Sequence, residues 1–189
     1  VDTVVSKWRR IDALINCAGT TRFIAHGDLA AVDDMEFERV YRVNLIGMFQ
    51  MTRAAVPVLR DSSTAAHSTS VINISSLAAL NGTGSSIAYA ASKGAVNTLT
   101  LSLARNLAPR IRVNALAPGM VDDGLPRRVL GEEAYAKIVD SMTNVAPLKR
   151  AGAAGIAVVS AVCAAADPES AARTLTREWE RTIFPLSLL

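Results

Sequence analysis

The stretch SVINISSLAALNGTGSSIAYAASK, residues 70–93, decides the fold of this chain. It opens on a short apolar run without charge, residues 70–75, which predicts a buried strand. From about Ser86 the pattern changes, because apolar residues now recur at helical spacing. We expect this helix to span 86–107 and to end before Pro109.

Segments on both sides repeat this alternation of strand and helix. Short apolar runs predict further strands at 13–16 and 111–117, and residues 2–10 resemble the end of another helix. Asp33 with Glu36 resembles a capping box, and a helix is expected from there to Pro57, because apolar residues again follow helical spacing. Strands that alternate with helices are parallel and joined by right-handed crossovers. The predicted fold class is therefore α/β, with a doubly wound parallel sheet.

Each predicted strand ends in small or polar residues. The three ends are Asn16-Cys-Ala-Gly19, Ser75-Ser76 and Ala117-Pro-Gly119. In a doubly wound sheet, ligands bind beyond the carboxyl ends of the strands. We therefore expect these three ends to border one binding crevice.

Three side chains near this crevice suggest proton transfer: Ser76, Tyr89 and Lys93. Tyr89 and Lys93 are four residues apart, so on a helix they lie on one face. A nearby ammonium favours the phenolate, and we expect Lys93 to lower the pKa of Tyr89 from its usual value near ~10. Ser76 could then steady the substrate oxygen that gains or loses the proton. The alternative is a tyrosine and a lysine that only pack, with the lysine ammonium reaching into water.

Composition excludes several other classes of function. Half of the residues are hydrophobic, and the net charge is only +3, with no cluster of basic residues of the kind that binds nucleic acid. No apolar run is long enough to span a membrane, and the first thirty residues lack the pattern of a signal peptide. The two cysteines have no metal-ligand spacing around them. We expect a cytoplasmic protein without a metal site.

The sequence resembles the short-chain dehydrogenase/reductase family, classical type, and within it the 3-oxoacyl carrier-protein reductases, over roughly residues 10–152. Several ordered motifs carry the resemblance: Asn16-Cys-Ala-Gly19, Asn44 in Val-Asn-Leu-Ile-Gly, Ser76, Tyr89 with Lys93, and Pro118-Gly119. It implies a Rossmann-type fold, an NAD or NADP cofactor and hydride transfer.

The resemblance also implies a role for each matching residue. Tyr89 would be the general acid or base, with Lys93 lowering its pKa and holding the nicotinamide ribose. Ser76 would hydrogen-bond the substrate, and Asn44 would lie at a helix irregularity and hold a water in a proton relay. The residues implied beside the cofactor are Asn16, Ala18, Gly19, Tyr89, Lys93, Pro118, Gly119 and Val121.

The chain also departs from the family pattern before Asn16. Nothing there matches the first strand and the glycine-rich turn that binds pyrophosphate, and we find no counterpart of the first three family strands. We therefore expect a single incomplete domain over 1–189, truncated at its N-terminal side, with an exposed apolar edge at 13–16. Gly82-Thr-Gly84 lacks the required third glycine, so we expect it in the wall of the substrate pocket.

Further departures follow Gly119. Asp122 and Asp123 stand where the family commonly has a threonine, and 177–181 replaces its final strand. Residues 120–147 suggest an insertion with a helix from Glu132 to Met142. It could act as a substrate lid or as a plain connection.

We expect an NAD(P)-dependent oxidoreductase that interconverts a ketone and a secondary alcohol of small size. The alternative is a truncated, non-catalytic short-chain-dehydrogenase-like module without the pyrophosphate loop. The resemblance further implies a homo-oligomer, a dimer or tetramer, through the helices at 33–57 and 86–107. Those helices could equally cover only their own sheet.

Overall fold

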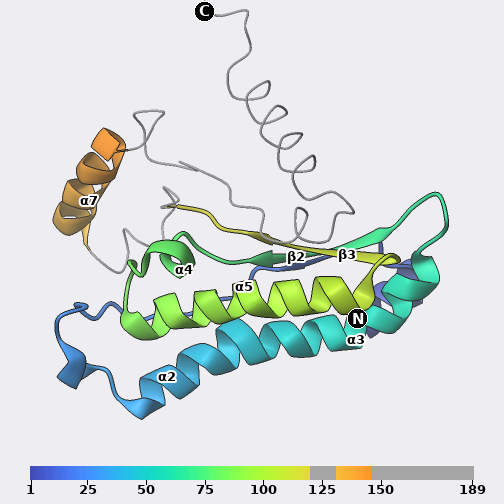
Figure 1. The fold of residues 1–189 in the computed structure, drawn as a ribbon, viewed down its shortest axis with the longest axis horizontal. Coiled ribbons are helices and arrows are strands. Elements are labelled where there is room, and N and C mark those ends of the chain that lie inside the picture. Colours follow the sequence, from blue (N-terminus) through green and yellow to red (C-terminus); the bar gives the residue numbers. More distant parts are fainter. Residues whose placement is uncertain (120–130, 146–189) are drawn as a thin grey trace, which may run out of the picture.

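The computed structural model describes residues 1–119 and 131–145. In this part of the chain, three strands form one parallel sheet in the order β1-β2-β3 (Figure 1). They are β1 (Ala13–Asn16), β2 (Thr69–Ile74) and β3 (Ile111–Leu116). Ala13 pairs with Ser70 and Thr69 pairs with Ile111, so the three carboxyl ends lie at the same edge. The predicted α/β class and the three predicted strands are confirmed.

Helices connect the strands and cover the sheet. They are α1 (Asp2–Trp8), the 3₁₀ helix η1 (Leu29–Ala31), α2 (Asp34–Tyr41), the π-helix η2 (Arg42–Gly47), α3 (Met48–Ser62), α4 (Ala78–Asn81), α5 (Ile87–Leu107) and α7 (Glu132–Val145). Helix α3 packs against β1 and β2, and α5 packs against β3. Figure 1 shows α3 and α5 running along the same side of the sheet. The short π-helix joins α2 to α3 without a break in the chain of helical turns.

The hydrophobic core lies between these two helices and the strands. Its buried members are Ala55, Leu59, Val71, Ala104, Leu107, Ile111 and Val113. Every second residue of β2 and β3 is buried. This is expected because successive side chains of a strand point to opposite faces of the sheet, and one face is covered by helices. The core therefore fixes the direction of α5, which carries the predicted catalytic pair.

The expected capping box at the start of α2 forms only in part. The Asp33 carboxylate accepts a hydrogen bond from the Glu36 backbone N–H at 2.8 Å. The Glu36 side chain does not return to the cap, because Arg39 takes both of its carboxylate oxygens, at 2.8 and 3.0 Å. One residue thus caps the helix.

The prediction that this helix ends at Pro57 is wrong. Helix α3 continues through Pro57 to Ser62. Proline inside a helix removes one hydrogen bond and costs about 3 kcal/mol. Here Ala55 and Leu59 are almost fully buried on either side of it, at 1% and 0% exposure, and burial of such a face supplies most of the stability of a helix in a protein.

Strand β1 lies at one edge of the sheet within the described residues. It pairs with β2 alone, and the Ile15 side chain is 60% exposed. An exposed apolar edge was predicted at this segment. Among the helices of residues 1–119 and 131–145, none has the length and apolar composition needed to cross a membrane.

Candidate active site

Helix α5 places Tyr89 and Lys93 on adjacent turns above the ends of the strands. The Ser86 hydroxyl caps the helix by accepting a hydrogen bond from the Tyr89 N–H at 3.2 Å. Ser86 is extended and fully buried, so the helix begins at Ile87 in a fixed position. The cap therefore sets where the phenol of Tyr89 stands relative to β2.

Ser76, Tyr89 and Lys93 come together as predicted from their spacing. The Ser76 side chain lies close enough to the Tyr89 phenol to act on its pKa, and the Ser76 hydroxyl accepts from the Ala78 N–H at 3.1 Å. The Lys93 Nζ atom lies 5.7 Å from the centre of the Tyr89 ring. A serine hydroxyl, a phenol and an ammonium thus lie together at the carboxyl end of β2.

The pKa of Tyr89 moves in the direction opposite to the prediction. Burial raises it above its ordinary value, and the hydrogen bond from Ser76 lowers it by less. Lys93 does not bring it down, because its ammonium lies toward the main chain of β2 rather than at the phenol oxygen. Tyr89 therefore carries its proton at neutral pH and is prepared to donate it.

Lys93 is a buried cation. Its side chain is only 4% exposed, and Nζ donates to the Ile74 carbonyl at 2.7 Å. Burial lowers the pKa of Lys93 to about 8, and the nearby Cys17 works against that shift. The alternative that this lysine reaches into water is wrong. An ammonium has three donors, so two remain after the bond to Ile74.

Asn44 lies in the π-helix and is completely buried. Its side chain binds both backbone groups of Thr20: Oδ1 accepts from the N–H at 2.7 Å, and Nδ2 donates to the carbonyl at 3.0 Å. Nδ2 also donates to the Ser92 hydroxyl at 3.0 Å, which in turn donates to the Tyr89 carbonyl. Asn44 thus joins the turn after β1 to the helix of the catalytic pair. The water relay implied at this residue stays a prediction.

Asn16 belongs to a buried polar network below the site. Its Nδ2 atom donates to the hydroxyl of Thr52 at 3.0 Å and to Oδ1 of Asn73 at 2.8 Å. The Nδ2 atom of Asn73 in turn donates to the Thr100 hydroxyl at 3.0 Å. This network ties β1 and β2 to α3 and α5 without leaving a buried polar side-chain atom unsatisfied in the described residues.

The remaining residues predicted beside the cofactor surround this cluster. A Cβ atom on Gly19 would lie 3.6 Å from Asn44 Oδ1 and 3.8 Å from Lys93 Nζ, so Gly19 lies against both side chains. Ala18 precedes it and is exposed. The Pro118 carbonyl accepts from the Leu77 N–H at 2.9 Å, which holds the Pro118-Gly119 segment beside the strand end that carries Ser76. Val121 lies outside the described residues.

Gly84, in the segment Gly82-Thr83-Gly84, lies against Tyr89, and the place of this segment in the wall of a substrate pocket stays a prediction. Gly84 has a φ of +106°, and a Cβ atom there would meet Ala78 at 3.0 Å and the Tyr89 ring at 3.4 Å. Both the backbone conformation and the space require glycine. This close approach fixes one side of the Tyr89 ring.

Sequence reasoning missed several positioning residues of the site: Ser75, Ser86 and Ser92, with Thr52, Asn73, Asn97 and Thr100 further in. For Asn73 the signal was a polar residue inside a short apolar run, between Ile72 and Ile74.

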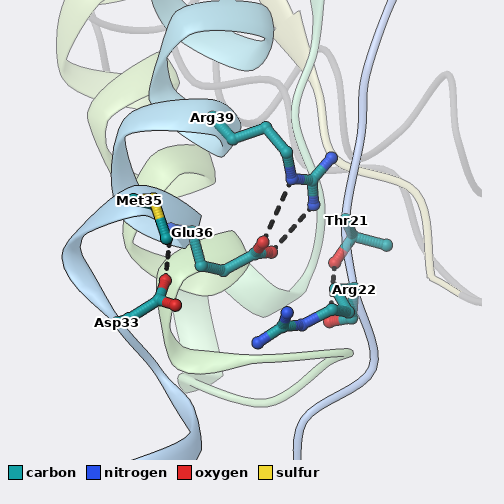
Figure 2. A pocket seen from close by; sticks show the side chains of 6 residues that line it. All are labelled: Thr21, Arg22, Asp33, Met35, Glu36 and Arg39. Atoms are coloured by element: carbon teal, nitrogen blue, oxygen red, sulfur yellow. Dashed lines mark hydrogen bonds and ion pairs between the residues drawn. The ribbon is translucent and has the colours of Figure 1, made fainter.

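A separate pocket of about 380 Å³ opens near the start of α2. Figure 2 shows the Arg39 guanidinium facing the Glu36 carboxylate there, with Arg22 nearby. Its lining residues are Thr21, Arg22, Asp33, Met35, Glu36 and Arg39. None of them belongs to the predicted catalytic set, so this pocket is distinct from the Tyr89 site. An apolar groove of about 500 Å³ lies between η2–α3 and α5.

The described residues fit the nicotinamide half of a dinucleotide. Lys93 and Tyr89 offer hydrogen-bond donors of the kind that ribose hydroxyls accept, and the exposed Gly19 leaves backbone without a side chain next to them. No group of metal-binding side chains is present in residues 1–119 and 131–145.

Comparisons with known proteins agree with this geometry. The family model described as short chain dehydrogenase matches residues 1–134. A Streptomyces violaceoruber protein of the granaticin polyketide synthase, named as a ketoacyl reductase, is 39% identical over 152 residues, which are 80% of this chain and 58% of that protein. The matched part of this chain thus spans about half the length of these curated relatives.

Solved structures give the same result. A crystal structure described as that of a short-chain dehydrogenase/reductase from Burkholderia xenovorans is 58% identical in sequence, with a TM-score of 0.71. The match covers 99% of this chain and 64% of that one. An NAD⁺-bound xylitol dehydrogenase is 29% identical, with a TM-score of 0.68 over 80% of this chain and 60% of that one. An NADP complex of RhlG from Pseudomonas aeruginosa is 27% identical, with a TM-score of 0.69 over 92% of this chain and 60% of that one.

Proposed function

Because this chain belongs to the short-chain dehydrogenase family, we propose that the protein interconverts a ketone and a secondary alcohol with NAD or NADP. The observation that carries the proposal is the meeting of Ser76, Tyr89 and Lys93 at the carboxyl end of β2. A bound nicotinamide supplies or accepts the hydride, which leaves a proton for the protein to move.

Tyr89 is the proton donor in this proposal. Its raised pKa keeps the phenol protonated at neutral pH, so in reduction the hydroxyl gives its proton to the carbonyl oxygen as that oxygen gains negative charge. Ser76 lies beside the Tyr89 phenol and would hydrogen-bond the same substrate oxygen. Oxidation of the alcohol runs these transfers backwards and requires the phenolate.

Lys93 holds the cofactor in the proposal. The two donors that remain on its ammonium bond the ribose hydroxyls. The backbone of Asn16, Ala18 and Gly19 borders the cofactor on one side. Pro118, Gly119 and Val121 border it on the other.

Cofactor binding and turnover test the proposal together. Titration of the protein with NADH and with NADPH, followed by fluorescence, should saturate with at least one of them. Turnover of a panel of small ketones should follow with the cofactor that binds. Absence of saturable binding would instead support the alternative of a non-catalytic module. Binding without turnover of any ketone or secondary alcohol would refute the proposed reaction.

A second copy of this chain is the partner that fits the apolar groove. Its lining residues are Leu45, Ile46, Phe49, Ala95, Thr98 and Leu99. Ile46 and Phe49 remain 46% and 40% exposed, which is costly for large apolar side chains gathered in one place. The family resemblance assigns oligomer contacts to these same helices.

Light scattering tests this assembly. We expect a mass of two or more chains, and Phe49→Asp should lower that mass to one chain because it puts a charge into the apolar contact. Leu29→Asp is the matched control, since Leu29 is 69% exposed and lies outside the groove. A single-chain mass for the unaltered protein would contradict the assembly.

A further inference from the structure

Ser75 occupies the position between β2 and the predicted catalytic Ser76. It is only 3% exposed. Its N–H donates to the Leu116 carbonyl at 2.7 Å, and the Leu77 N–H donates to the Pro118 carbonyl at 2.9 Å. Pairing with the β3 side therefore continues past the end of β2, and it holds the main chain of 75–77 in place.

The Ser75 side chain reaches across to α5. Its hydroxyl donates to Asn97 Oδ1 at 2.7 Å and lies 3.3 Å from the Lys93 carbonyl oxygen. Asn97 is one helical turn beyond Lys93, so both contacts fall on the stretch of helix that carries the catalytic lysine. The hydroxyl thus connects the strand end to that stretch.

Two other contacts join the same two segments. The Lys93 ammonium donates to the Ile74 carbonyl at 2.7 Å, and the Ser76 side chain lies close enough to Tyr89 to lower its pKa. Both use groups that the cofactor or substrate would also need. The Ser75 contact uses none of these groups, so it can persist throughout a reaction cycle.

We propose that Ser75 is a positioning residue, whose hydrogen bond to Asn97 fixes the spacing between Ser76 and the face of α5 that carries Tyr89 and Lys93. The inference rests on the proposed function and adds to it a residue that does not touch the substrate. Proton transfer depends steeply on geometry, and a misplacement of about 1 Å can cost about 100-fold in rate. The hydroxyl also satisfies the Asn97 oxygen, which loses its donor without it.

Kinetics of three variants test this role. Ser75→Ala and Asn97→Leu should each lower kcat by about 10- to 100-fold, with unchanged affinity for the cofactor. The double variant should be no worse than either single variant, because both remove the same bond. Ser102→Ala removes an exposed hydroxyl from the same helix and should leave kcat unchanged.

Titration of Tyr89 gives a readout that does not depend on turnover. The chain has three tyrosines. The signal of Tyr89 is therefore the absorbance of ionised tyrosine in a protein with Tyr89 minus that in the same protein with Tyr89→Phe. It is recorded at pH values at which the protein remains folded. Ser76 lowers the pKa of Tyr89, so a loosened Ser76 should let that pKa rise in Ser75→Ala. A variant that is only less stable would keep the Tyr89 titration of the unaltered protein.

The outcomes separate the two proposals. If Ser75→Ala and Asn97→Leu leave both kcat and the Tyr89 titration unchanged, the positioning role is wrong while the proposed function stands. If the unaltered protein reduces no ketone, the proposed function fails. The Tyr89 titration then still tests whether Ser75 positions Ser76 relative to Tyr89. Should Ser75→Ala fail to fold, Asn97→Leu removes the same bond from the half-buried partner.

Discussion

Replacing Tyr89 by Phe should lower kcat by about 10²- to 10⁴-fold, the range that a positioned general acid contributes. The substitution removes only the hydroxyl. The ring remains to pack against Gly84, and the backbone contacts of Ser86 and Ser92 with residue 89 are unaffected. Cofactor affinity should change much less than kcat, because the Lys93 donors for the ribose remain.

The measurement is kcat for the best ketone of the panel at saturating cofactor, with cofactor affinity from fluorescence. Tyr41→Phe is the matched control. Tyr41 lies on α2, where its ring packs against Phe37 with 6.3 Å between the ring centres, and it is not one of the proposed site residues. Turnover that survives in Tyr89→Phe would remove Tyr89 from the mechanism.

Replacing Lys93 by Met should have the second large effect, a loss of at least about 100-fold in kcat/KM. Methionine has similar length and suits a buried position, but it supplies no donors for the ribose. Lys137→Met is the control, because Lys137 is exposed and pairs with Glu133 on its own helix. Unchanged cofactor affinity in Lys93→Met would show that Lys93 does not hold the ribose.

The same substitution should change how stability depends on pH. The pKa of Lys93 is about 8 in the folded chain against 10.5 for the free side chain, because burial disfavours the ammonium. Between these values the unfolded chain binds more protons, so the free energy of unfolding rises with pH across this range. The cost of the buried charge is present in full below pH 8 and disappears above 10.5.

This difference between the folded and the free pKa of Lys93 corresponds to about 3 kcal/mol in the free energy of unfolding. Denaturant unfolding at a series of pH values should show this rise in the unaltered protein and not in Lys93→Met. Burial also raises the pKa of the neighbouring Tyr89, which lowers stability only above the ordinary pKa of a tyrosine. Parallel curves for the two proteins would show that Lys93 is not a buried cation.

The sequence predicted the strands and α5 well because their signals are local. A short apolar run with few charges has few alternatives to a buried strand, and the spacing from Ser86 to Leu107 is helical throughout. Tyr89 and Lys93 could be paired for the same reason, since four residues on a helix place them on one face. The structure shows them together with Ser76 at the end of β2.

What the sequence could not predict depends on contacts between distant segments. Ser75 meets Asn97 across 22 positions, and Asn16 meets Asn73 across 57. No motif contains both partners of either bond. The direction of the Tyr89 pKa was missed for the same reason, because burial raises it and the Lys93 ammonium is directed to the Ile74 carbonyl instead. Helix α3 passes Pro57 because buried neighbours compensate for the lost hydrogen bond.

The wide turn over Arg42–Gly47 makes chain length matter more than side-chain identity in this part of the molecule. A π-turn holds one residue more than an α-turn, and each residue rotates an α-helix by about 100°. Deleting one residue here would give a more regular helix, yet it would turn either Asn44 or the α3 face that covers β1 away from its partners. An aligned homologue with a single-residue gap in this turn must therefore connect the loop after β1 to α5 by other contacts.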